Sequence, residues 1–110
     1  MDTVTKQYIE TVKVSDIPWH RLTTTYGRAT DFPTELDVLW NMESIEVVDA
    51  AGEALAQNIE HQSTLWHATP FAMIFLLRIF KNAQEERAHN EVAQYLAEQL
   101  VELFTVIAEC

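Results

Sequence analysis

Residues 44–61 read SIEVVDAAGEALAQNIEH and carry the clearest helical pattern in the chain. Their large apolar side chains recur at spacings that place them on one face of a helix, and these are Ile45, Val48, Leu55 and Ile59. We therefore predict an α-helix over residues 44–61 that buries this face in the core.

The same helix carries a row of acidic residues away from its apolar face. Because a helix turns by about 100° per residue, Glu46, Asp49, Glu53 and Glu60 fall within an arc of about 80°. We call these four residues the acidic ridge. Since Val48 lies on the opposite side of the helix, we expect the ridge to face outward.

Basic residues are missing around the ridge. No Lys or Arg lies between Arg28 and Arg78, an interval that contains eight acidic residues. Runs of charge are usually solvated faces, but such faces normally mix both signs. Like-charge neighbours such as Glu46 and Asp49 destabilise a helix by about 0.2 to 0.5 kcal/mol per pair. A ridge with this cost suggests a role in binding a basic surface, with Glu35 and Asp37 at its rim.

Capping residues and prolines mark the other helices. Asp16 with Pro18 and Asp31 with Pro33 are typical helix starts, and Thr69 with Pro70 is a third. With the apolar spacing, they predict helices over residues 16–27, 30–41, 69–82 and 84–108. Residues 1–15 are compatible with an extended arm or a short helix. We expect the buried aromatic residues to include Trp19, Trp40 and Trp66.

These elements predict an all-α fold. The chain has 110 residues, two glycines and three prolines, and it holds about five helices joined by short linkers, an arrangement that favours antiparallel neighbours. We expect a single domain in which residues 16–82 form two helix pairs and residues 84–108 cover their exposed end. The lengths of these pairs are close to those of α-solenoid repeats.

Composition argues against several classes of partner. Seventeen acidic and seven basic residues give a net charge of −10, which repels phosphate backbones and anionic lipid headgroups. The apolar run over residues 71–77 is too short to span a bilayer. The only cysteine, Cys110, suits a reducing compartment. We expect a cytoplasmic protein that binds neither nucleic acid nor membrane.

The sequence offers little catalytic chemistry. Glu86 and His89 match the Glu-x-x-His pattern of di-iron sites, but the second copy that such a site needs is missing. His61 and His67 flank hydroxyl residues without a glycine elbow or an oxyanion loop, so an enzyme is only a minor alternative. We therefore predict no catalytic site, no metal, no cofactor and no small-molecule substrate.

Three segments resemble a known group of proteins. They are DIPWHRL at residues 16–22, YGRATDFP at residues 26–33 and HQSTLWHAT at residues 61–69. In bacterial HEAT-like helical repeat proteins, a Pro-Trp-x-x-Leu helix, a Tyr-Gly-x-Ala turn, an Asp-x-Pro helix start and a His-Gln-x-Thr turn recur in this order. The resemblance extends over residues 16–80 and implies a short HEAT-like stack of helices.

Such proteins are similar in size and acidity to the immunity proteins of contact-dependent toxin systems. The resemblance implies a non-enzymatic protein that binds one basic toxin, often a nuclease, and blocks its active site. An acidic ridge suits this role, because a nuclease presents Lys and Arg to phosphate. The alternative is a general helical adaptor that grips a partner through apolar residues around Trp66 and Phe71.

Overall fold

The protein is all-α, as predicted. The computed structural model describes residues 2–24, 27–61, 64–65 and 68–109, with only the backbone described at 23–24, 27–28, 60–61 and 64–65. In this part of the chain the α-helices are α1 (Thr3–Thr11), α2 (Phe32–Asn41), α3 (Ile45–Ile59), α4 (Thr69–Glu86) and α5 (Glu91–Ala108). The short elements are the 3₁₀ turns η1 (Val14–Asp16) and η2 (Trp19–Arg21) and the strands β1 (Thr23–Thr24), β2 (Gly27–Arg28), β3 (Glu60–His61) and β4 (Thr64–Leu65).

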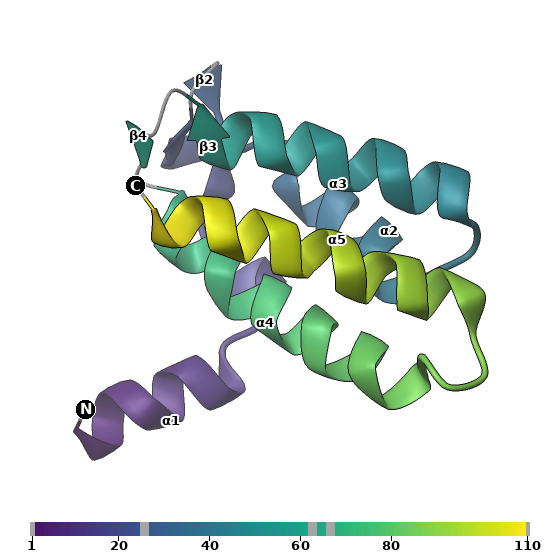
Figure 1. Cartoon of the computed structure of the whole chain (residues 1–110). Helices are drawn as coiled ribbons and strands as arrows, with labels where there is room; N and C mark the ends of the chain where they lie inside the picture. Colours follow the sequence, from purple (N-terminus) through teal and green to yellow (C-terminus); the bar gives the residue numbers. More distant parts are fainter. Residues whose placement is uncertain (1, 25–26, 62–63, 66–67, 110) are drawn as a thin grey trace.

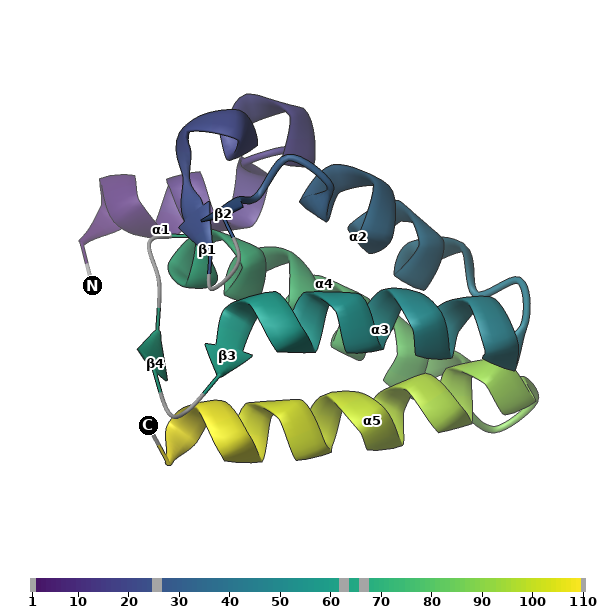
Figure 2. The ribbon, with the colours of Figure 1, turned by 90° about the horizontal axis from the view of Figure 1, so that it is seen from above.

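Helices α2 to α5 form the body of the molecule, and α1 projects from it (Figure 1). Within this body, consecutive helices are antiparallel, so α3 and α5 run in the same direction and lie side by side (Figures 1 and 2). The strands make two small antiparallel hairpins, in which Thr23 lies opposite Arg28 and Glu60 lies opposite Leu65. The predicted antiparallel neighbours are therefore confirmed.

The core lies between these four helices. Its largest fully buried side chains are Phe32, Leu36, Leu39, Val48, Leu55, Ile59, Leu76 and Leu96. Small residues such as Ala83 and Ala97 are fully buried on α4 and α5, which lets the two helices approach closely. The predicted buried face of α3 is confirmed for Val48, Leu55 and Ile59, whereas Ile45, in the first turn, is 37% exposed.

The helix predicted over residues 16–27 is wrong. Ile17 adopts an extended conformation, consistent with the restriction that Pro18 places on the residue before it, and only the short turn η2 follows. Both Ile17 and Trp19 are buried. Two residues separated by one position point to different sides of a helix, so the irregular backbone is what brings both into the core. The predicted pair of helices over residues 16–41 is therefore one helix, α2, preceded by turns.

Trp19 anchors this irregular segment. Its ring lies against Phe32 and Phe75, at centroid distances of 5.6 and 5.9 Å, and its Nε1–H donates a hydrogen bond to the carbonyl of Val14 at 2.9 Å. The prediction that Trp19 is a core residue is confirmed. Trp40 instead is 49% exposed, at the edge of the buried face that Leu36 and Leu39 form on α2, so the prediction that it is a core residue is wrong. Trp66 lies outside the described residues.

The ends of α4 and α5 differ from the prediction. Helix α4 continues to Glu86, and α5 begins only at Glu91. The break is set by Asn90, whose side-chain oxygen accepts hydrogen bonds from the backbone N–H groups of Val92 and Ala93 at 3.0 and 3.3 Å. This is an N-cap, which satisfies donors that the first turn of a helix leaves free.

The open question of residues 1–15 is answered by α1, a helix with no buried residue. Arg78 of α4 holds it: the guanidinium donates hydrogen bonds to the backbone carbonyls of Ile9, at 2.6 Å, and of Val12. The same guanidinium lies 5.1 Å from the centre of the Phe75 ring. A cation at the carboxyl end of a helix also interacts favourably with the helix dipole.

Candidate functional site

Three residues of the acidic ridge lie together on α3. Glu46, Asp49 and Glu53 are exposed, while Val48 and Leu55 face the core. The predicted outward orientation of these carboxylates is therefore confirmed. Helix α5 lies beside α3, so this flank of α3 borders a second helix.

Asp49 is connected to α5 by a hydrogen bond. The hydroxyl of Tyr95 donates to the Asp49 carboxylate at 2.5 Å. This bond raises the pKa of Tyr95, and desolvation and the negative charges of Asp49, Glu102 and Glu53 act in the same direction. These acidic groups from two helices therefore share one electrostatic environment.

A groove of about 520 Å³ runs between α3 and α5. Buried side chains form its floor, among them Leu39, Leu55, Leu76 and Leu96. Its walls carry polar groups, which are Asp49 and Glu53 on α3 and Gln99 and Glu102 on α5. We call it the α3–α5 groove. An apolar floor between polar walls is a common form of binding site in proteins.

The charge of this groove has one sign. Neither α3 nor α5 contains Lys, Arg or His. Within the part of the chain that is described, no basic side chain lines the α3–α5 groove. The carboxylates of Asp49, Glu53 and Glu102 thus create a negative potential without a local counter-charge.

Sequence reasoning missed the α5 side of this site. Tyr95, Gln99, Glu102 and Val106 follow the spacing of one helical flank, and that spacing was a visible signal for a second wall. What the sequence did not indicate was the pairing of this flank with α3. Tyr95 and Asp49 are 46 residues apart, and only the tertiary fold brings them together.

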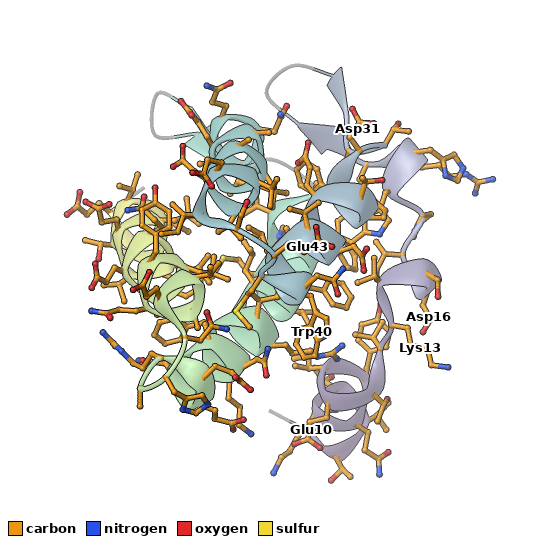
Figure 3. All side chains as sticks on the ribbon, turned by 90° about the vertical axis from the view of Figure 1, so that its right-hand side faces the viewer. Glu10, Lys13, Asp16, Asp31, Trp40 and Glu43 are labelled. Carbon is orange, nitrogen blue, oxygen red and sulfur yellow. The ribbon has the colours of Figure 1, made fainter. Side chains whose placement is uncertain are left out.

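Glu60 and Asp37 do not extend this cluster in the way that we predicted. Helix α3 ends at Ile59, so Glu60 belongs to β3, and its side chain lies outside the described part. Asp37 is exposed but lines a different groove, between α2 and α4. This second groove, of about 610 Å³, also contains Trp40 and Arg78. Figure 3 views this side of the molecule and labels Trp40.

Glu35, the other predicted rim residue, is half-buried on α2. One of its carboxylate oxygens is buried without a hydrogen-bond partner in the described structure. Desolvation, together with the negative charge of Asp31, raises its pKa from 4.5 to about 7. A carboxylate in this state is poorly placed to receive a basic partner, because burial favours its neutral form.

The catalytic candidates form no site in the described structure. Glu86, which is half-buried at the end of α4, lies beside the exposed His89, with 3.6 Å between Oε2 and Nε2. Among the described residues, no group of three or more His, Cys, Asp or Glu side chains is arranged to hold a metal ion. The His61 side chain, His67 and Cys110 lie outside the described part.

Comparison with known proteins found no protein similar to this chain. No protein-family model, no curated protein and no solved structure matches this chain. The described helices also lack the combination of length and apolar character that a membrane span requires. The function is therefore inferred from the surface of α3 and α5.

Proposed function

We propose that this chain is a non-enzymatic binding protein that docks a basic protein on α3 and α5. The single observation that carries the proposal is the cluster of Asp49, Glu53 and Glu102 around a groove that no basic residue of the described structure lines. Glu46 continues the same charge along α3. Opposite potentials would accelerate association and fix the orientation of the partner.

The partner that suits this surface best is a basic toxin, and the chain would then be an immunity protein. A nuclease must present Lys and Arg to phosphate, and a row of carboxylates can occupy that site as a phosphate mimic. The resemblance of residues 26–33 and 61–69 to HEAT-like helical repeat proteins supports the same proposal, whereas residues 16–22 form turns in place of the helix of that pattern. In this role the chain acts in the cytoplasm of the cell that makes the toxin.

A general helical adaptor is the second candidate. The observation that favours it is the accessible apolar lining of the α3–α5 groove, where Ala56, Leu103 and Val106 offer apolar contact to a partner. The two functions differ in their response to ionic strength. Binding through charge weakens steeply as salt is raised, whereas binding through apolar contact does not.

The test uses the protein encoded by the adjacent upstream reading frame as the probe. We expect its carboxyl-terminal domain to be basic and to co-purify with this chain. The triple variant Glu46→Lys, Asp49→Lys and Glu53→Lys should weaken binding by about 100-fold or more, because each attraction becomes a repulsion. Isothermal titration calorimetry at low and high salt measures the effect.

A matched control makes the same change in net charge elsewhere. Glu10, Glu85 and Glu109 are exposed on α1, on α4 and after α5, and their triple substitution by Lys should leave the affinity much closer to that of the wild type. Circular dichroism should show equal helical content in both variants. Equal loss of affinity in the two would refute a localised acidic site.

A further inference from the structure

Gly52 lies in the middle of α3 and lines the α3–α5 groove. Glycine in the interior of a helix is less favourable than alanine by about 1 kcal/mol. Among the described residues, a Cβ at this position would meet only the Cδ2 atom of Leu39, at 4.0 Å, which is an ordinary van der Waals contact. Packing within the chain therefore gives no reason for the missing side chain.

Because Gly52 has no side chain, the backbone of α3 is open to the groove at this position. Asp49 and Glu53, one turn apart, stand on either side of Gly52 along the helix. Small residues at a helix surface allow another element to approach closely, and Ala56 extends this low stretch by one more turn. On the α3 side of the groove, the side chains are therefore smallest next to the acidic residues.

The charges are distributed on both sides of the apolar floor. Asp49 and Glu53 belong to one wall, and Glu102 belongs to the other. The matching surface has an apolar stripe flanked by Lys or Arg on both sides, which is the pattern of a basic amphipathic helix.

An extended strand would fit less well. The backbone N–H and C=O groups in the middle of α3 and α5 are used within the helices, so the groove offers no strand edge to pair with. A helical partner satisfies its own backbone. Helix α3 has 15 residues and a length of about 22 Å, so the partner helix needs about four turns to cover it.

From these features we infer that the α3–α5 groove receives a basic amphipathic helix of the partner, and that Gly52 keeps the groove open for it. This inference rests on the proposed function, since it names the part of the basic partner that docks. It also unites the two candidate functions, because charge and apolar contact then act at one place.

The first experiment uses a designed peptide of leucine and lysine, about four turns long, with all leucines on one helical face. Fluorescence anisotropy follows its binding, and circular dichroism follows its helix formation. A second peptide has the same composition but spreads the leucines around the helix. We expect only the amphipathic peptide to bind and become helical, and equal binding of both peptides would overturn the inference.

The second experiment fills the groove without changing any charge. Gly52→Leu should weaken binding of the amphipathic peptide by about tenfold or more, because the added side chain fills the space in the groove that the peptide would occupy. Ala50→Leu makes a similar addition at an exposed position of α3 and should leave binding unchanged. Gly52→Ala is a milder variant that should raise the melting temperature and still weaken binding. Unaltered affinity in both Gly52 variants would overturn the inference.

The full-length basic partner separates the two proposals. If the lysine variants at Glu46, Asp49 and Glu53 abolish binding while Gly52→Leu leaves it intact, the acidic surface stands and the helix-in-groove inference fails. If neither set of variants changes the affinity, both proposals fail.

Discussion

Replacing Glu35 by Gln should change how the stability of the protein depends on pH. The carboxyl group has a pKa of about 7 in the folded protein, against an ordinary value of 4.5. The folded state therefore holds this proton more tightly than the unfolded state. Its contribution to stability is fully present below pH 4.5 and is lost as the pH rises through about 7.

The size of the effect follows from the same values. A difference of this size in pKa corresponds to about 3 kcal/mol for a fully buried group. Because Glu35 is only half-buried, screening by solvent reduces the expected effect to about 1 kcal/mol. Glutamine keeps the shape of the neutral acid and cannot ionise, so Glu35→Gln should be more stable than the wild type above neutral pH by about this amount.

Urea unfolding followed by circular dichroism, from about pH 5 to about pH 8.5, measures the difference. The free energy of unfolding should fall less with rising pH in Glu35→Gln than in the wild type. Glu43→Gln removes an exposed carboxylate between α2 and α3 and should follow the wild-type profile. Parallel profiles for Glu35→Gln and the wild type would refute a strongly raised pKa.

Two further variants test how α1 and α5 are held. Arg78→Met removes two hydrogen bonds from a charged donor to α1, together worth about 3 kcal/mol, so amide exchange in α1 should accelerate about 100-fold or reach the unprotected rate. Lys81→Met, with the same change of charge on α4, should leave that exchange unaltered, and unchanged exchange in Arg78→Met would contradict the attachment. Asn90→Ala removes the cap of α5 and should lower the free energy of unfolding by about 1 kcal/mol, with Asn90→Ser restoring most of it. Chemical unfolding checks this prediction, which an unchanged midpoint in Asn90→Ala would contradict.

The helices that could be predicted are those whose signals are local. Pro33 and Pro70 mark the first turns of α2 and α4, and the apolar spacing of α3 locates its buried face. The orientation of Glu46, Asp49 and Glu53 followed from the same periodicity, because helical geometry alone relates a charge to the buried face of its own helix.

Features that depend on a second element could not be predicted in this way. The bond between Tyr95 and Asp49 needs the pairing of α3 with α5, and the half-burial of Glu35 depends on what covers α2. At Ile17 and Trp19 the tertiary core overrode the local helix signal, because both side chains are buried although their spacing does not suit one helical face. In the sequence, Gly52 is only an unfavourable residue in the middle of a helix, and its place beside a groove depends on the packing of α3 against α5.

The attachment of α1 has a consequence for how this part of the chain can vary. Arg78 holds main-chain oxygens of Ile9 and Val12, and every amino acid supplies the same carbonyl. Since no side chain of α1 is buried, its outer residues can be exchanged for other good helix formers without loss of the hydrogen bonds from Arg78. This makes α1 a natural place for grafting a recognition epitope or a reporter peptide, away from the surface formed by α3 and α5.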